Sequence, residues 1–131
     1  MATLHNSIVI EVPPEKVWDA LRDVGALHTR LVPGFVVDTK LEGDTRVVTF
    51  GNGLVAREAI LSVDDERRRL AWNASGGQAT HYNAVLEVFP DAKGTRVEWT
   101  TDLLPHELAS GIQAMQEQGL ATMRKTLEAQ R

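Results

Sequence analysis

The sequence predicts an α+β fold in which a curved antiparallel sheet of about seven strands wraps around a long C-terminal helix, with two short helices after the first strand. Three observations support it. Segments rich in β-branched and aromatic residues recur between residues 35 and 102 and are separated by turn sequences. One apolar stripe with helical spacing follows Pro105. The 131 residues, 43% of them hydrophobic, suffice for one core, which predicts a single domain over residues 1–131.

The N-terminal part predicts a strand followed by two short helices. Residues 4–12 alternate apolar and polar side chains, which is typical of a strand with one buried face. Pro13-Pro14-Glu15 ends this strand and begins a helix, because proline and a carboxylate both suit the first helical turn. We expect this helix to end near residues 23–25. A second helix is predicted over residues 26–30, before Pro33-Gly34.

The central part predicts six further strands, each bounded by glycine, proline or acidic turn residues. They are expected over residues 35–41, 46–50, 54–63, 69–74, 82–89 and 95–102. The short connections between them are typical of hairpins, so we expect one antiparallel sheet.

The C-terminal part predicts a long amphipathic helix. Its apolar stripe consists of Leu108, Ile112, Met115, Gly119, Met123 and Leu127. Its polar face carries Glu107, Gln113, Glu117, Arg124 and Glu128. A sheet with one apolar face can bury this stripe by curving around it. Because Ala84 and Gly119 are small, we expect room for a ligand midway along the gap between helix and sheet.

Composition disfavours several classes of protein. The formal net charge of −4 disfavours a nucleic-acid partner. No apolar run approaches the roughly 20 residues of a membrane span, and the N-terminus lacks the pattern of a signal peptide, so we expect a cytoplasmic protein. There is no cysteine, and the four histidines have no metal-binding spacing, so we predict no metal and no cofactor. Nothing marks a subunit interface, although the sequence is compatible with a homodimer.

The order of these elements resembles the START/SRPBCC superfamily, the helix-grip fold, and its polyketide cyclase/dehydrase branch in particular. The resemblance covers essentially the whole chain. The segments that carry it are Val17-Trp18 after Pro13-Pro14, Leu27-His28 before Pro33-Gly34, Gly43-Asp44-Thr45-Arg46, Glu58-Ala59-Ile60 with Asp64-Asp65-Glu66, and Gly94 to Trp99.

The resemblance implies a hydrophobic cavity that binds lipids, sterols, polyketides or plant hormones. In the hormone-receptor branch a glutamate of the fourth strand and a tyrosine of the sixth line the pocket, and Glu58 and Tyr82 resemble them. The segment Gly51-Asn52-Gly53-Leu54 lacks the proline of that branch's gate, so hormone sensing is not implied.

One strand gives conflicting indications about which face is buried. Val55, Leu61 and Val63 share a face with Arg57, so periodicity alone places Arg57 inside. The resemblance places Glu58 inside, and a β-bulge could switch the faces. We favour Glu58; the alternative is a surface glutamate paired with an arginine of a neighbouring strand.

Three functions follow from the candidate residues. We predict a module that binds a small hydrophobic molecule, such as a lipid, a polyketide or an aromatic compound. An alternative is a cyclase, dehydratase or isomerase using Tyr82 with Glu58 or His28, with Arg30 near the cavity mouth. Another is an interaction domain with a filled core. The predicted ligand-binding residues are Leu31, Phe35, Glu58, Ile60, Trp72, Tyr82, Ala84, Leu86, Trp99, Ile112, Met115 and Met123.

Overall fold

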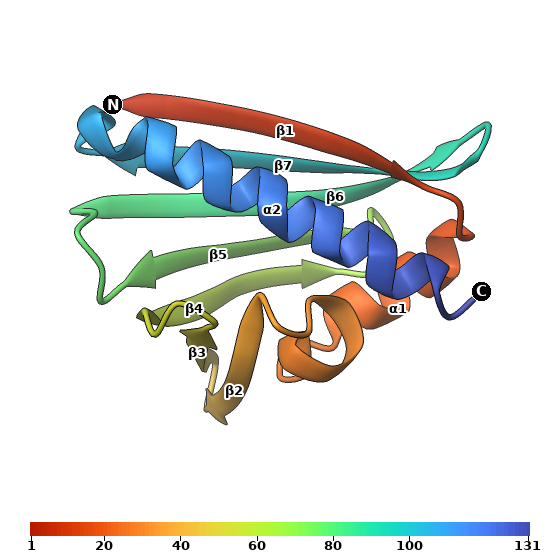
Figure 1. The fold of residues 1–131 in the computed structure, drawn as a ribbon, viewed down its shortest axis with the longest axis horizontal. Helices are drawn as coiled ribbons and strands as arrows, with labels where there is room; N and C mark the ends of the chain where they lie inside the picture. Colours follow the sequence, from red (N-terminus) through yellow and green to blue (C-terminus); the bar gives the residue numbers. More distant parts are fainter.

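The computed structural model describes all 131 residues and has a seven-stranded sheet with one long helix across its face (Figure 1). In chain order the elements are β1 (Ala2–Ile10), α1 (Pro14–Arg22), a π-helical turn η1 (Leu27–Leu31), β2 (Val36–Glu42), β3 (Thr45–Phe50), β4 (Val55–Asp64), β5 (Arg69–Ser75), β6 (His81–Asp91), β7 (Gly94–Leu104), a 3₁₀ turn η2 (His106–Leu108) and α2 (Ala109–Glu128).

The sheet is antiparallel throughout, with the strand order β1-β7-β6-β5-β4-β3-β2. Every connection from β2 to β7 is therefore a hairpin, and β1 joins the sheet beside the last strand. The helix-grip arrangement expected from the sequence is confirmed. The second helix differs slightly from its prediction, because it is a π-helical turn that begins and ends one residue later.

The core lies between α2 and the concave face of the sheet. The alternation predicted for the last strands is confirmed, since Ala84, Leu86 and Val88 of β6 and Val97 and Leu103 of β7 are buried. Helix α2 buries Gly119, Met123 and Leu127 of the predicted stripe. It also buries Leu120 and Gln116, which the stripe omitted.

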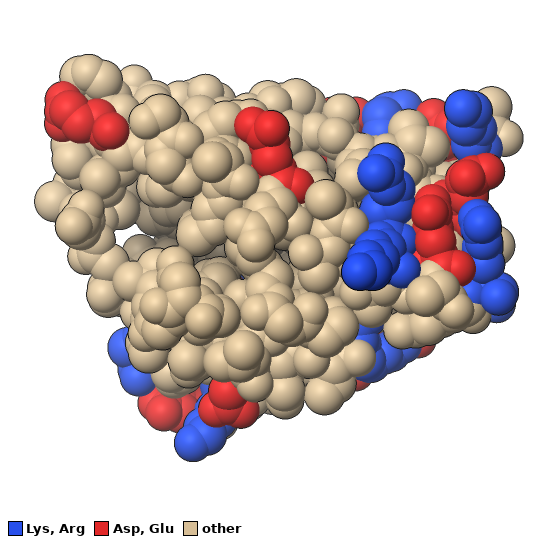
Figure 2. All heavy atoms as spheres, in the orientation of Figure 1, with Lys and Arg blue, Asp and Glu red and all other residues tan.

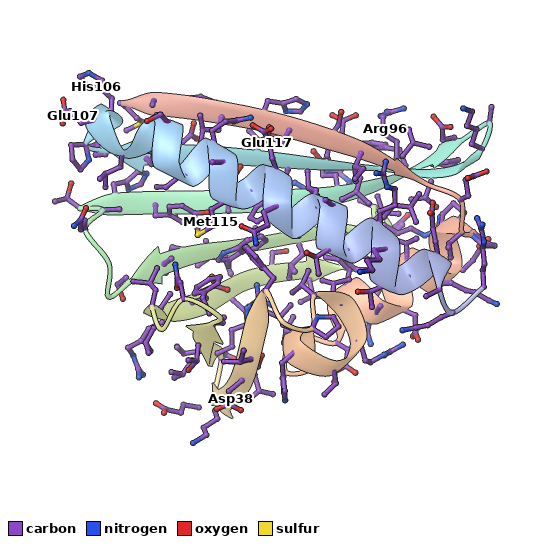
Figure 3. The ribbon with its side chains drawn as sticks, viewed as in Figure 1. Asp38, Arg96, His106, Glu107, Met115 and Glu117 are labelled. Carbon is purple, nitrogen blue, oxygen red and sulfur yellow. The ribbon has the colours of Figure 1, made fainter.

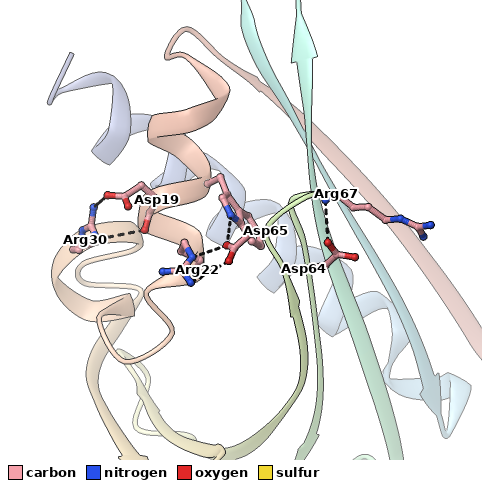
Figure 4. Close-up of polar contacts among 7 residues, drawn as sticks. Asp19, Arg22, Arg30, Asp64, Asp65 and Arg67 are labelled. Carbon is pink, nitrogen blue, oxygen red and sulfur yellow. Dashed lines mark hydrogen bonds and ion pairs between the residues drawn. The ribbon is translucent and has the colours of Figure 1, made fainter.

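Polar contacts fix α1 at one end of the sheet (Figure 4). Trp18 is buried beneath α1, and its Nε1 donates to Asp65 in the β4–β5 turn at 2.9 Å. Arg22 Nε donates to the same carboxylate at 2.7 Å. The hydrogen bond from Arg22, with that from Trp18, lowers the pKa of Asp65. Helix α1 therefore closes this end of the gap between α2 and the sheet, and the opposite end is left free for a mouth.

Candidate functional site

Two cavities lie end to end between α2 and the sheet. The inner cavity has a volume of about 60 Å³ and the outer one about 490 Å³. Phe50, Glu58, Tyr82 and Met115 line both, so these four residues form the junction. Figure 2 shows the surface hollowed beside the loop between β5 and β6, where the outer cavity opens.

The inner cavity is almost filled by its own walls. Its lining is largely apolar and includes nine predicted residues: Glu58, Tyr82 and Met115 at the junction, with Leu31, Phe35, Trp72, Leu86, Trp99 and Met123. A Cβ atom built on Gly119 would meet the ring of Phe35 at 3.2 Å and that of Trp99 at 3.4 Å. The expectation of room midway along the helix is therefore wrong, because these two rings occupy the space that Gly119 leaves.

The outer cavity supplies most of the open volume. Four of its lining residues were predicted: Glu58 and Tyr82 at the junction, and Ile112 and Met115 in the first turns of α2. Figure 3 shows Met115 extending from α2 toward the sheet. The remaining lining residues were not predicted: Phe50, Leu54, Ala56, Ala74, Ser75, Gly76, Gly77, Gln78, Ala79, Leu108 and Gly111. Most are small residues or belong to the loop after β5, and no periodic pattern distinguishes such a loop in the sequence.

A buried ion pair forms part of the junction. Arg46 and Glu58 lie directly opposite each other in the β3–β4 ladder, and both side chains point inward. Arg46 Nε donates to Glu58 Oε1 at 2.7 Å, and the guanidinium lies over the Trp72 ring, 5.2 Å from its centroid. Burying either charge alone would be unfavourable, so each side chain accounts for the presence of the other.

The structure settles which face of β4 is buried. Glu58 is 7% exposed, whereas Arg57 lies on the outer face and donates to Glu42 at 2.9 Å. The periodicity that placed Arg57 inside is therefore wrong. A register shift does occur between Ile60 and Ser62, but it lies beyond Glu58 and does not reverse its direction. The signal in the sequence was Arg46, a cation on the inward face of β3 that needs a carboxylate opposite.

Tyr82 presents a neutral phenol at the junction. Burial, together with the nearby charge of Glu58, raises the pKa of Tyr82 to about 12, while hydrogen bonds with Gln116 and Thr101 act in the opposite direction. Gln116, which is fully buried, donates to the Tyr82 hydroxyl at 3.2 Å. The phenol therefore keeps its proton through the physiological pH range and can act as a hydrogen-bond donor.

Several candidate residues lie away from both cavity linings. Ile60 and Ala84 pack in the core, and His28 is on η1 outside either lining. Arg30, expected near the mouth, instead pairs with Asp19 at 2.7 Å on the surface beside α1 (Figure 4). The structure thus brings Glu58 and Tyr82 together at one junction and leaves His28 apart from them.

Three further features of the structure concern a metal site, buried polar groups without a partner and a membrane-spanning helix. No three histidine or acidic side chains converge in a way that could hold a metal ion. The indole N–H groups of Trp72 and Trp99, both in the wall of the inner cavity, have no hydrogen-bond partner. None of the helices is both long and apolar enough to cross a membrane.

Comparisons with known proteins agree with this architecture. A family model described as polyketide cyclase / dehydrase and lipid transport matches residues 1–128. The structure of XoxI from Bacillus cereus is similar with a TM-score of 0.87 at 20% identity, covering 100% of this chain and 99% of that chain. A protein from Thermobifida fusca is 30% identical, with a TM-score of 0.77 and coverage of 97% and 93%. Ara h 8.0201 is 15% identical with a TM-score of 0.77, covering 98% of each chain. Curated proteins gave no match.

Proposed function

Because this chain belongs to the polyketide cyclase/dehydrase and lipid transport family of the START/SRPBCC superfamily, we propose that it binds a small, largely apolar molecule in the outer cavity. The observation that carries the proposal is the outer cavity itself, whose volume of about 490 Å³ falls in the range of small-molecule sites. Its lining is mostly apolar, and two polar side chains lie at its inner end.

The position of those polar groups supports a definite orientation of the ligand. Leu54 and Ile112, which line only the outer cavity, offer apolar surface toward the mouth, while Glu58 and Tyr82 lie at the junction. An apolar body in the outer cavity removes surface from water, which supplies affinity at roughly 25 cal/mol per Å² of apolar area buried. A polar group at its inner end meets Glu58 and Tyr82, which supply selectivity.

Native mass spectrometry of the protein purified from its own host tests the proposal. We expect a bound small molecule that is released by organic solvent, and an increase in melting temperature when the emptied protein is titrated with the same molecule. The absence of any adduct, together with unchanged melting temperatures across a library of fatty acids, sterols and polyketides, would contradict it.

Binding is favoured over catalysis by the arrangement at the junction. A cyclase or dehydratase would need a free base beside the Tyr82 donor. His28 is outside both linings, and one oxygen of Glu58 is already bonded to Arg46.

Cytoplasmic location and a lack of nucleic-acid partners belong to the same proposal, and they rest on the composition of the chain.

A further inference from the structure

A chain of hydrogen-bonded side chains connects the surface to the junction of the two cavities. It begins at Glu117 on α2, which lies between α2 and β1 in Figure 3. Gln113 Nε2 donates to Glu117 Oε1 at 2.9 Å, and Asn6 Nδ2 donates to Gln113 Oε1 at 3.0 Å and to Gln116 Oε1 at 2.9 Å. Gln116 Nε2 then donates to Thr101 Oγ1 at 2.8 Å and to the Tyr82 hydroxyl.

Glu117, the first residue of this hydrogen-bond network, fixes the orientation of every amide group that follows it. The carboxylate of Glu117 can only accept, so the NH₂ group of Gln113 must face it. The carbonyl of Gln113 then accepts from the NH₂ group of Asn6, which also donates to Gln116, while the carbonyl of Asn6 accepts from Gln113 Nε2. Gln116 in turn must present its carbonyl to Asn6 and its NH₂ group to Tyr82 and Thr101. Reversing any single amide would place two donors, or two acceptors, against each other.

The last hydrogen bond of the network, from Gln116 to Tyr82, sets the direction in which the Tyr82 hydroxyl can donate. Its oxygen accepts from Gln116, so its own proton cannot be used in that bond. The Thr101 hydroxyl oxygen accepts from the same NH₂ group of Gln116 at 2.8 Å, and the Tyr82 hydroxyl donates to no protein group. The hydroxyl proton of Tyr82 is therefore free to donate a hydrogen bond to a molecule in either cavity, since Tyr82 lines both.

We propose that Asn6 and Gln116 are positioning residues that hold Tyr82 as a hydrogen-bond donor into the cavity, and that the cavity thereby selects apolar ligands carrying an acceptor such as a ketone or quinone carbonyl. This inference rests on the proposed function and narrows its ligand class.

The same network offers a way to reverse the selectivity without touching the cavity. Asn6 is in neither cavity lining, and Asn6→Asp changes one NH₂ group to an oxygen of similar size. The carboxylate that this substitution introduces can only accept. It keeps the bond from Gln113 Nε2 and loses the one to the Gln113 carbonyl, and Gln116 must turn its NH₂ group toward it and its own carbonyl toward Thr101 and Tyr82. Both hydroxyls then donate to Gln116, and the Tyr82 oxygen faces the cavity as an acceptor.

Three tricyclic probes of similar shape test this directly: fluorene, which has no polar group, fluorenone, which has only an acceptor, and carbazole, which has an N–H donor. In the unmodified protein we expect fluorenone to bind about three- to tenfold more tightly than fluorene, the range that one net hydrogen bond provides. Tyr82→Phe should remove this preference. Asn6→Asp should remove it and make carbazole the tighter ligand instead. Tryptophan fluorescence gives the dissociation constants, because Trp72 and Trp99 line the inner cavity.

Asn73→Asp is the matched control, since Asn73 is exposed on β5, the strand next to the β6 strand of Tyr82, and its substitution introduces the same charge. It should leave the fluorenone-to-fluorene ratio unchanged. Loosening of the fold alone would weaken all three probes together, whereas the inference requires the ratio to change. Binding of all three with no carbonyl preference, or an Asn6→Asp ratio equal to that of the unmodified protein, would overturn it.

Failure of the proposed function has a different signature, namely that none of the three probes binds the unmodified protein. The direction of the hydroxyl is then read without a ligand from the carbon-13 signal of the Tyr82 Cζ atom, which is unambiguous because the chain has one tyrosine. A Cζ shift in Asn6→Asp that is absent in Asn73→Asp supports the positioning role, and identical signals in all three proteins overturn it.

Discussion

At the scale of single residues, the buried Arg46–Glu58 pair should be the most sensitive to substitution. Both side chains are almost completely buried and face each other across one ladder position. We expect Glu58→Leu to lower the free energy of unfolding by about 3–5 kcal/mol, because it leaves an uncompensated guanidinium in the core. The double variant Arg46→Met with Glu58→Leu should recover most of this loss. Urea denaturation measures both.

The neighbouring exposed pair provides the control for that prediction. Arg57 and Glu42 lie on the outer face at 2.9 Å, with both side chains more than half exposed. Arg57→Met should change the free energy of unfolding by less than about 1 kcal/mol, as is typical of surface ion pairs. Equal losses from Arg57→Met and Glu58→Leu would show that the Glu58 carboxylate is not buried as described.

Because of Tyr82, the free energy of unfolding should decrease as the pH rises above 10. Folding raises the pKa of its phenol from 10.0 to about 12, so the folded state holds its proton more tightly than the unfolded chain does. This contribution is complete below pH 10 and is lost as the pH rises toward 12, by roughly 2 kcal/mol. Tyr82→Phe should show a correspondingly shallower decline over the same range. Parallel declines in the two proteins would contradict the raised pKa.

Residue-level prediction from the sequence succeeded where one strand carried a clear alternation and failed where charge overrode it. Tyr82 and Leu86 were placed inward on β6 correctly, because their neighbours on that face are all apolar. On β4 the more apolar face was the exposed one, since the register with β3 sets Glu58 against Arg46. Gln116 was missed because its burial depends on Asn6, more than a hundred residues away in the chain.

At the scale of elements, the first turns of α2 should control access to the outer cavity. Gly111 lines this cavity, and a Cβ atom placed on it would meet no atom within 4 Å. Gly111→Trp should therefore fold normally while filling the mouth with an indole ring. We expect at least a tenfold loss of affinity for fluorene, about 1.4 kcal/mol.

Ala114→Trp provides the comparison, because Ala114 is exposed on the same helix and is in neither cavity lining. It should retain the affinity of the unmodified protein. Equal affinities in the two tryptophan variants would place the binding site away from the start of α2.

Prediction at this scale was limited by what turns and loops reveal. Strand and helix boundaries followed from turn residues and periodicity, so β3 and α2 were found close to their predicted places. The loop after β5 forms much of the mouth, yet its run Ser75-Gly76-Gly77-Gln78 indicated only a loose connection. Its role depends on the position of α2 opposite, which is a tertiary property.

At the scale of the whole molecule, the layout was predictable because one sheet face and one helical stripe each require burial. The position of the open space was not. Phe35 and Trp99 fill the middle of the gap, and α1 with η1 closes one end, so the room lies at the other end. Side-chain packing in three dimensions determines which rings fill a gap, and this packing cannot be inferred from the spacing of residues in the sequence.

The central claim is that a ligand occupies the outer cavity with its inner end at the junction. The three methionines of the chain report on it together in a methyl NMR spectrum. Met115 lines both cavities, Met123 lines only the inner one, and Met1 is exposed. On titration with fluorenone we predict the largest shift for the Met115 methyl signal, a smaller one for Met123 and none for Met1. A Met115 signal that stays in place while fluorenone binds would contradict the claim.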